Sequence, residues 1–423
     1  MSDGDPDYLM ERIGREGFRR TVTMSKDYDV IVVGAGPGGS TASRFCAQAG
    51  LKTLLVEKEQ LPRYKPCGGC LSTKTVRLLG FDLSPVLENT IYKVEFTYCL
   101  KEAFSIESKE PIVFLVMRDR FDQLLAKKAQ ERGTEILEGE RVLRIREGTD
   151  EIGVELSSGK KLRCESLIGA DGAKSVVAKS LSLLPKKGGG RGIGLEVEIP
   201  FESATSFPKE DFHRVHLEFG RTPSGYGWIF PKRNFLSVGI GGMFIDPGKT
   251  KLDQCLIHFL NGLSYIKGGE TRRAIGHSLP SFYDEGQRVS QGSVLLVGDA
   301  GSMIDPLTGE GIYYAIRSGM LAADAILQSR EKGILPSDLY QTAVRLSIFE
   351  NLKWALLFAR FVNRFNKLSY QTLRHYPELG TLYLKVLDGG ETYQGFVAGV
   401  KQRMKDLLKG RFSDRIKRAM AET

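Results

Sequence analysis

The segment "YDVIVVGAGPGGS" constrains the fold of this chain more than any other. Residues 28–33 form an uninterrupted apolar run, which is typical of a parallel strand buried on both faces. The pattern Gly-x-Gly-x-x-Gly follows at 34–39, and then come residues with helical apolar spacing and a second apolar run, "TLLVEK". This order predicts a β-turn-α-β unit whose turn binds the pyrophosphate of a dinucleotide.

The glycines of this turn have separate tasks. Gly34 allows the tight turn, Gly36 lets the backbone approach a pyrophosphate, and Gly39 lets the helix pack on the strand. The start of the helix also offers free N–H groups to phosphate. Glu57 ends the second strand, 21 residues after Gly36, where its carboxylate can accept hydrogen bonds from a ribose diol.

A later segment, "LLVGDAGSMIDPLTGEGI", predicts where the other end of the dinucleotide lies. Asp299 ends an apolar strand and can bind a ribityl hydroxyl. The N–H groups around Gly309 to Ile312 open a helix and can face the pyrimidine edge of a flavin. That edge gains negative charge on reduction, so the positive end of a helix dipole suits it.

The patterns divide the chain into four regions. The motif-bearing stretches predict a discontinuous Rossmann-like FAD-binding domain over residues 27–90, 119–182 and 288–332. The strand-rich stretches 91–118 and 188–287 predict an inserted β-domain for the substrate. Residues 336–423 predict a basic C-terminal helical region, and residues 1–26 predict a flexible extension.

Composition limits the class of protein. The net charge of +9 indicates an anionic partner, and residues 331–423 carry 16 Lys and Arg against 9 Asp and Glu. No nucleic-acid motif accompanies this charge, so we expect no nucleic-acid partner. The chain begins with charged residues and has no apolar run of the about 20 residues that span a membrane. The six scattered cysteines therefore predict a cytoplasmic protein with reduced thiols and no metal site.

The motifs together resemble the FAD-dependent oxidoreductases of the para-hydroxybenzoate hydroxylase fold, and among them the geranylgeranyl reductase family. The resemblance rests on "GAGPGGS", "KPCGG", "RDRFD", "GADGAKS", "GYGWIFP" and "GDAGSMIDPLTGEGI", and it runs from about Tyr28 to Tyr393. It implies an α/β fold: a Rossmann-like FAD domain with an inserted antiparallel β-sheet and a C-terminal helical cap.

The resemblance also implies a cofactor site and a reaction. The expected FAD-binding residues are Gly34, Gly36, Gly38, Gly39, Glu57, Cys67, Gly68, Gly69, Arg118, Val142, Asp171, Asp299, Gly309, Gly311 and Ile312. The family reduces C=C bonds of isoprenoid chains in diphosphates, chlorophyll, archaeal lipids or menaquinone, so we expect a prenylated small molecule or lipid as substrate. No second Gly-x-Gly-x-x-Gly follows a strand, which leaves NADPH and a ferredoxin as alternative electron donors.

Reduction of an isolated alkene needs a general acid, because a hydride from the flavin must be matched by a proton. Cys67, Tyr226 and an ordered water are the candidates. A desolvated Cys67 would stay protonated at neutral pH, but the favoured interpretation of Cys67 is a loop residue that packs on the flavin.

One predicted strand carries an aromatic residue at every second position, so these side chains share a face: Tyr226, Trp228 and Phe230. This spacing leaves two interpretations open. The three rings form either an aromatic wall that binds the prenyl chain beside the flavin or an ordinary core between two sheets.

The "KPCGGC" segment places Cys67 and Cys70 in a C-x-x-C pattern. No second pair of cysteines completes a zinc site of four ligands. The family resemblance implies a small residue at position 70, so Cys70 departs from it. Because of this departure, a reversible disulfide between Cys67 and Cys70 is a second, less favoured hypothesis.

Other interpretations of function and partners stay open. A flavin-dependent monooxygenase or halogenase, or a quinone-linked electron-transfer flavoprotein, would use the same fold. The segment 400–420 has apolar residues at helical spacing among many Lys and Arg. It predicts either peripheral contact with an anionic membrane or a docked helix with a solvated basic face.

Overall fold

The computed structural model describes residues 26–148, 151–183, 190–204, 206–243, 251–266 and 274–406. Nearly all of the extension expected at 1–26, and the end of the basic segment expected at 400–420, lie outside these residues. The described part contains an eight-stranded sheet, a seven-stranded sheet, a three-stranded sheet and a group of C-terminal helices.

The eight-stranded sheet is parallel at its centre, as a nucleotide-binding sheet requires. In spatial order its parallel strands are β8 (Glu135–Glu138), β2 (Thr53–Glu57), β1 (Tyr28–Val33), β11 (Lys161–Gly169) and β18 (Val294–Leu296). Antiparallel strands complete it: β17 (Ser290–Gln291), β9 (Val142–Glu147) and β10 (Ile152–Leu156). Because β1 and β2 are buried almost throughout, their sequences are apolar without alternation.

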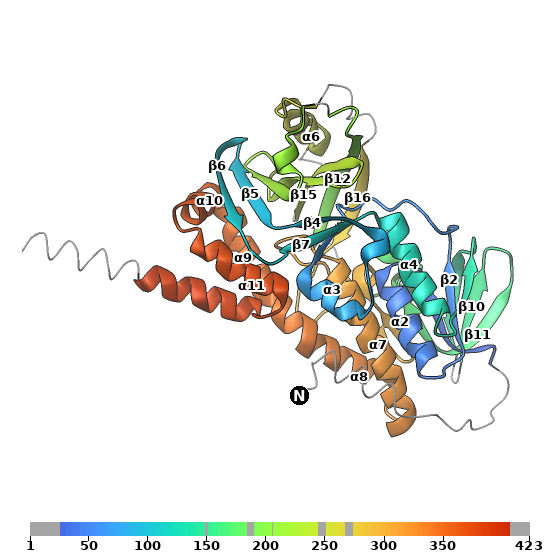
Figure 1. Cartoon of the computed structure of the whole chain (residues 1–423). Helices are drawn as coiled ribbons and strands as arrows, with labels where there is room; N and C mark the ends of the chain where they lie inside the picture. Colours follow the sequence, from blue (N-terminus) through green and yellow to red (C-terminus); the bar gives the residue numbers. More distant parts are fainter. Residues whose placement is uncertain are drawn as a thin grey trace, which may run out of the picture.

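Helices from distant parts of the chain cover this sheet (Figure 1). They are α2 (Pro37–Gln48), α4 (Arg118–Gln130), α5 (Val176–Ser180), α7 (Ile312–Lys332) and α8 (Pro336–Val344). Helix α3 (Thr73–Leu79) instead packs on α7 and β3. Helix α2 packs against both α4 and α7. The contact of α2 with α7 is close, because a Cβ atom on Gly319 would lie 2.4 Å from the carbonyl oxygen of Gly38.

The seven-stranded sheet forms the second domain. Its order is β16 (Ile275–Pro280), β12 (Arg191–Pro200), β15 (Phe235–Met243), β14 (Gly225–Pro231), β13 (Arg214–Phe219), β5 (Lys93–Tyr98) and β6 (Lys101–Glu107). All neighbours are antiparallel except β13 and β5, which run parallel. Helix α6 (Leu252–Asn261) packs on one face around Val197, Val238 and Phe259, so the other face is free to line the site.

The stretch 91–118 divides between two sheets. Strands β5 and β6 join the seven-stranded sheet, whereas β7 (Val113–Val116) pairs with β3 (Cys70–Ser72) and β4 (Leu87–Ile91) in a small antiparallel sheet. This small sheet continues directly from the Cys67–Gly69 loop, which it therefore anchors. Short 3-10 turns occur at Ser84–Val86, Gly172–Lys174, Lys209–Asp211 and Gly298–Gly301.

The C-terminal helices lie beside β5 and β6 (Figure 1). They are a π-helical turn (Arg345–Phe349), α9 (Glu350–Arg364), α10 (Asn366–His375), α11 (Glu378–Asp388) and a helical segment at 393–406. The Tyr370 hydroxyl fixes α10 to the seven-stranded sheet by donating to the carbonyl oxygen of Phe96 at 3.1 Å. In the part of the chain that the structure describes, no helix combines the length and apolarity needed to cross a membrane.

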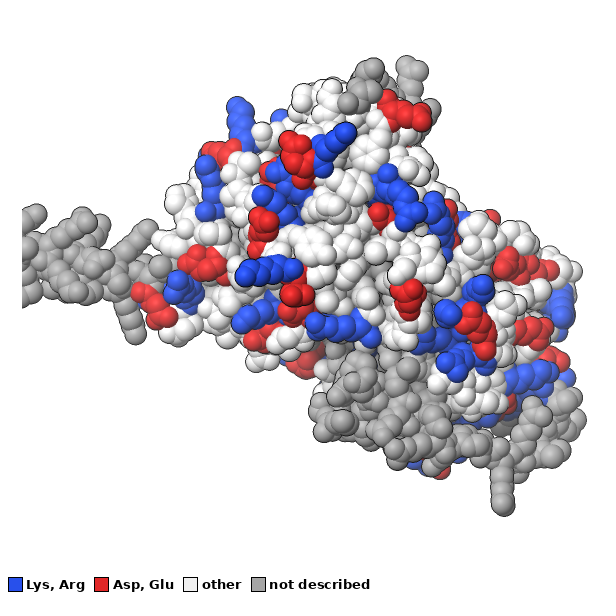
Figure 2. All heavy atoms as spheres, viewed as in Figure 1, with Lys and Arg blue, Asp and Glu red and all other residues white. Residues whose placement is uncertain are grey.

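Basic and acidic side chains are interspersed over the face shown in Figure 2. The excess positive charge of the chain therefore does not gather into one patch on this face. The fold class expected from sequence is confirmed: a Rossmann-like domain, an inserted and largely antiparallel sheet, and C-terminal helices.

The close packing of α2 on α7 gives a test of the fold. We expect Gly319→Ala to lower the free energy of unfolding by about 1–3 kcal/mol, because the added methyl group has no space against the Gly38 carbonyl. Gly153→Ala is the matched control, since its Cβ atom would meet nothing closer than 3.8 Å. Urea denaturation of both variants measures the difference, and equal stability of the two would contradict this account.

Candidate active site

A cavity of about 1810 Å³ connects the three parts of the fold. Its walls come from the carboxyl ends of the parallel strands, the free face of the seven-stranded sheet and the C-terminal helices. The cavity is lined by all of the predicted site residues except Gly39: Gly34, Gly36, Gly38, Glu57, Cys67, Gly68, Gly69, Arg118, Val142, Asp171, Tyr226, Trp228, Phe230, Asp299, Gly309, Gly311 and Ile312.

The glycine turn has the shape that a pyrophosphate needs. Gly34 has φ of +102°, and a Cβ atom there would lie 2.5 Å from the Ala170 carbonyl oxygen. A Cβ atom on Gly39 would lie 1.9 Å from the Gly34 carbonyl oxygen, so Gly39 serves packing rather than contact with the cavity. A Cβ atom on Gly36 would meet no atom within 4 Å, so there is open space at the N-terminus of α2. These residues fit the pyrophosphate of FAD.

Glu57 lies beside this turn and is 3% exposed. Its Oε2 accepts a hydrogen bond from the Ala35 N–H at 2.8 Å, and its Oε1 accepts one from the Glu59 N–H at 3.2 Å. Arg63 lies 3.5 Å from the same carboxylate. Because each carboxylate oxygen can accept two bonds, capacity remains for a ribose diol.

A buried carboxylate joins Glu57 to the cysteine loop. Asp122 accepts one hydrogen bond from Arg63 at 2.8 Å and two from Arg118, both at 2.8 Å. Burial acts to lower the pKa of Arg118, but the charge of Asp122, with a contribution from Cys67, outweighs it and raises the pKa. Arg118 therefore stays cationic beside the Cys67 loop.

Asp299 follows β18 and faces two basic groups. The Nε2 atom of His277 lies 3.9 Å from its carboxylate, and Lys65 Nζ lies 2.5 Å from the same ring nitrogen. Burial acts to raise the pKa of Asp299, but His277 and Lys65 outweigh it and lower the pKa. Asp299 therefore offers a carboxylate that can accept from ribityl hydroxyls.

Asp171 plays a different part from Asp299. Its Oδ2 atom accepts hydrogen bonds from the N–H groups of Val176 at 2.6 Å and Val177 at 3.3 Å, and so holds the start of α5. Burial raises the pKa of Asp171. Val142, at the start of β9, is buried and contributes to the wall near Arg141.

The N–H groups of the loop before α7 are mostly bonded within the loop itself, those of Gly309 and Glu310 included, and this fixes its shape. Asp305 accepts from the N–H groups of Leu307 at 2.7 Å and Thr308 at 3.1 Å, and its other oxygen accepts from the Tyr393 hydroxyl at 2.6 Å. Gly309 has φ of +74°, a conformation that favours glycine. Helix α7 then begins at Ile312, which lines the cavity together with Gly311, so the first turn of the helix borders the site.

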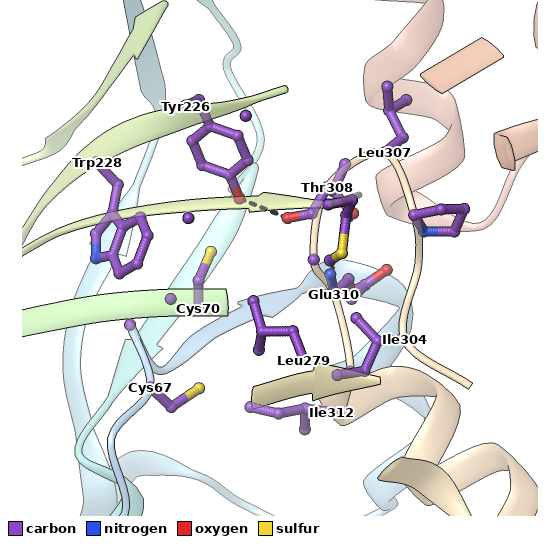
Figure 3. A pocket seen from close by; sticks show the side chains of 18 of the residues that line it. Cys67, Cys70, Tyr226, Trp228, Leu279, Ile304, Leu307, Thr308, Glu310 and Ile312 are labelled. Carbon is purple, nitrogen blue, oxygen red and sulfur yellow. Dashed lines mark hydrogen bonds between the residues drawn. The ribbon is translucent and has the colours of Figure 1, made fainter. Parts of the chain in front are cut away.

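The Cys67–Gly69 loop closes one wall of the cavity. The Gly69 N–H lies 3.4 Å from Cys67 Sγ, and Gly69 has φ of +65°. Figure 3 shows both Cys67 and Cys70 pointing into the pocket, and both are free thiols. Burial raises the pKa of Cys70, so this thiol stays protonated. The disulfide remains a hypothesis.

The aromatic residues of β14 lie beside the Cys67–Gly69 loop and continue the same wall, across the pocket from Leu307 and Thr308 (Figure 3). The rings of Tyr226 and Trp228 lie 6.2 Å apart and edge to face, and Phe230 follows Trp228 at 6.2 Å. The Tyr226 hydroxyl donates to the Thr308 carbonyl oxygen at 2.5 Å. Trp228 rests on Gly239, where a Cβ atom would lie 2.3 Å from the indole. The glycine leaves room for the ring.

Beyond Tyr226 the cavity becomes apolar and reaches the C-terminal helices. Its lining there includes Leu357, Phe358 and Phe361 of α9, Leu373 of α10, Leu384 of α11, and Phe396 and Val400 of the last segment. The spacing of these residues predicts helices, but no sequence signal shows that they line a site.

Several charged cavity residues escaped the sequence analysis. Lys65 and His277 face Asp299, and Glu196 accepts a hydrogen bond from the Cys67 N–H at 3.2 Å. Lys65 opens the "KPCGG" motif, but its contact with His277 crosses more than two hundred residues of sequence. His277 and Glu196 belong to no motif, and they lie on strands whose order in the sheet the sequence does not reveal. Among the described residues, no group of three or more His, Cys, Asp or Glu is arranged to hold a metal ion.

Comparison with known proteins defines the class. A family model described as an FAD binding domain matches residues 27–333, so the chain is an FAD-binding protein. It is 31% identical over 329 residues to the geranylgeranyl diphosphate reductase of Rhodobacter capsulatus, and the matched stretch covers 74% of this chain and 78% of that protein. It is 29% identical over 352 residues to the menaquinone reductase of Mycobacterium tuberculosis, covering 79% and 85%.

The solved structures agree on the fold. A geranylgeranyl bacteriochlorophyll reductase-like protein from Thermoplasma acidophilum matches with a TM-score of 0.73 and 24% identity, covering 89% of this chain and 98% of that one. The chain therefore belongs to the geranylgeranyl reductase family of FAD-dependent oxidoreductases. The resemblance found in the sequence is confirmed.

Glu57 gives a test of the cofactor site. We expect Glu57→Ala to weaken FAD binding about 10- to 100-fold, because each hydrogen bond to a charged group contributes about 1.5–3 kcal/mol. The flavin absorbance per mole of purified protein, and titration of the apoprotein with FAD, measure the loss. Glu110→Ala, at an exposed loop position, is the control. Wild-type flavin content in Glu57→Ala would contradict the assignment.

Proposed function

We propose that this protein reduces C=C bonds of an isoprenoid chain with a hydride from reduced FAD. The observation that carries the proposal is the single cavity that joins the expected flavin site to the apolar interior of the C-terminal helices. The relatives named as geranylgeranyl diphosphate reductase and menaquinone reductase support the same substrate class.

The lining of the cavity suits a prenyl chain. A polyisoprene segment has no hydrogen-bonding group, so its binding depends on the apolar surface that it buries, at about 25 cal/mol per Å². The apolar helices supply that surface, and the rings of Tyr226 and Trp228 flank the passage toward Gly309 and Ile312 (Figure 3). We infer that one double bond at a time lies between this aromatic face and the flavin.

The reaction needs a proton as well as a hydride. Burial raises the pKa of Tyr226, so it stays a phenol, and its proton is directed at the Thr308 carbonyl. Cys67 points into the cavity and lies beside the Arg118 cation. Neither contact directs a proton toward the cavity, so Tyr226 and Cys67 stay the two candidate proton donors that the sequence predicts.

The reduction also consumes two electrons, which NADPH or a reduced ferredoxin would supply to the flavin. Anaerobic flavin bleaching by each donor, followed in a stopped-flow spectrometer, identifies the one that reduces the protein faster.

Contact with a lipid surface would let the substrate enter the cavity. Four large apolar side chains are about half exposed in α9 and at its junction with α10: Leu357, Phe361, Phe365 and Leu368. Three of them also line the cavity. Arg360 and Arg364 lie between them, so the group combines apolar and basic character, as a peripheral membrane site requires. This extends the contact that we expected from the basic C-terminal segment.

The exposed apolar side chains of α9 allow the proposed contact with a lipid surface to be tested. We expect the double variant Leu357→Glu/Phe361→Glu to bind vesicles containing anionic phospholipid at least about 10-fold more weakly, because two charges would have to enter the interface. Co-sedimentation measures the binding, and Leu335→Glu, at another exposed leucine, is the control. Equal binding of all three proteins would exclude this surface.

The function itself is tested by anaerobic incubation of dithionite-reduced protein with geranylgeranyl diphosphate, a geranylgeranylated lipid or menaquinone. We expect mass spectrometry to detect products heavier by two hydrogens per double bond, and flavin to reoxidise in step. Flavin-replete protein that adds hydrogen to none of these substrates would contradict the proposal. NADPH oxidation stimulated by an aromatic substrate in oxygen would favour a monooxygenase or halogenase, and reduction of quinone rings alone would favour an electron-transfer flavoprotein.

A further inference from the structure

Two buried charged side chains lie beneath the Cys67–Gly69 loop and have been given no chemical role so far. Glu196 of β12 is 3% exposed, and Lys232, directly after β14, is 1% exposed. Glu196 Oε1 accepts the Cys67 N–H at 3.2 Å. Lys232 Nζ lies 3.3 Å from the position of a Cβ atom on Gly69. Both groups therefore lie against the loop.

Each of these side chains keeps a polar atom without a partner. Glu196 Oε2 and Lys232 Nζ form no hydrogen bond within the part of the chain that the structure describes. A buried ionised group without a partner is costly, whereas a protonated carboxyl group costs much less. Burial raises the pKa of Glu196, while Lys232, the Cys67 N–H and Ser237 act in the opposite direction.

Glu196 also has access to the cavity. Glu196 lines the cavity together with Gly194, which lies two residues earlier on the same face of β12. Its partner across the sheet is Gly239 of β15, which has no side chain to cover it. The indole of Trp228 rests on that same glycine. The carboxyl group therefore lies beside the aromatic face that would hold the alkene.

We propose that Glu196 is the proton donor for alkene reduction, and that Lys232 tunes how firmly it holds the proton. This rests on the proposed function. The reduced flavin supplies the hydride, that is, one hydrogen and two electrons, to one alkene carbon. The Glu196 carboxyl O–H bond breaks and a C–H bond forms at the other carbon, which leaves a carboxylate that solvent reprotonates. In sum the alkene loses its π bond and gains two protons and two electrons, that is, two hydrogen atoms, and the flavin is oxidised by two electrons.

The role makes the reaction depend on pH in a defined direction. An acid must be protonated to act, so the rate is full below the pKa of Glu196 and falls as pH rises through it. The groups that influence this carboxyl group from the surrounding elements are Lys232, Arg118, Ser237, Tyr64, Glu198 and the Cys67 N–H. Lys232 lowers the pKa of Glu196, so its removal moves the falling limb to higher pH.

Glu196→Gln is the first test, because the amide oxygen can still accept the Cys67 N–H but the side chain has no acidic proton. In anaerobic single turnovers with a prenyl substrate, we expect flavin reoxidation to slow about 100-fold or more, with unchanged FAD content and substrate affinity. Glu107→Gln, at an exposed position of β6 in the same sheet and outside the cavity lining, should react within about twofold of wild type.

An infrared measurement provides a readout that does not depend on turnover. Burial also raises the pKa of other carboxyl groups: Asp171, Glu198, Glu218 and Asp305. The test therefore uses difference spectra. We expect the FAD-bound wild type at neutral pH to show a carboxylic C=O component that is lost in Glu196→Gln and kept in Glu107→Gln. Single turnovers of Glu196→Gln at near wild-type rate, or an unchanged band, would overturn the proposal.

Two further outcomes are decisive. If Glu196→Gln does not fold, Lys232→Met is the test instead. We expect the rate of this variant to fall at a higher pH than that of the wild type, and an unshifted pH–rate profile would overturn the role of Glu196 as proton donor. If the flavin-replete wild type hydrogenates no prenyl substrate, the proposed function fails, and the proton donor fails with it. That result differs from a slow variant beside an active wild type.

Discussion

The cofactor site depends on one buried carboxylate, that of Asp122. It is fully buried and binds two arginines, Arg63 and Arg118, by three hydrogen bonds of 2.8 Å. Arg63 reaches Glu57 beside the glycine turn, and Arg118 interacts with Cys67. A buried charge is tolerated only when it is paired in this way. The turn that would hold the pyrophosphate and the loop that would cover the flavin are therefore fixed relative to each other by the same side chain of α4.

The sequence predicted the parts of the site whose chemistry is local. A strand, a glycine turn and a helix follow one another along the chain, so Gly34, Gly36 and Glu57 could be located from spacing. Glu196 and His277 could not, because their roles arise from the order of strands in a sheet. The parallel pairing of β5 with β13 joins segments more than a hundred residues apart. The apolar wall of the C-terminal helices was equally invisible, because a helical face that lines a cavity has the same spacing as one that fills a core.

The cavity changes in character along its length, and this change follows from the fold. Near the parallel sheet, the strands end in polar groups and helix N-termini, which suit the charged parts of a dinucleotide. Near the C-terminal helices the walls are apolar side chains. Between them lie Tyr226 and Trp228, each with an apolar ring and one polar atom that is already bonded, to Thr308 and Ser237. Such residues can flank an uncharged alkene without leaving a polar group unsatisfied.

The two hydrogens of the proposed reaction would then come from two different domains. The hydride belongs to the flavin, which the α/β domain would hold, whereas Glu196 and Lys232 belong to the seven-stranded sheet. The Cys67–Gly69 loop lies between them and is tied to both, to the sheet through Glu196 and to the α/β domain through Arg118. Because hydride and proton must reach opposite ends of one double bond, the position of this loop sets the distance between the two sources. The loop can pack this closely only because residues 68 and 69 are glycines. A Cβ atom at Gly68 would lie 2.8 Å from the Phe230 ring, and one at Gly69 would collide with the Val116 carbonyl oxygen.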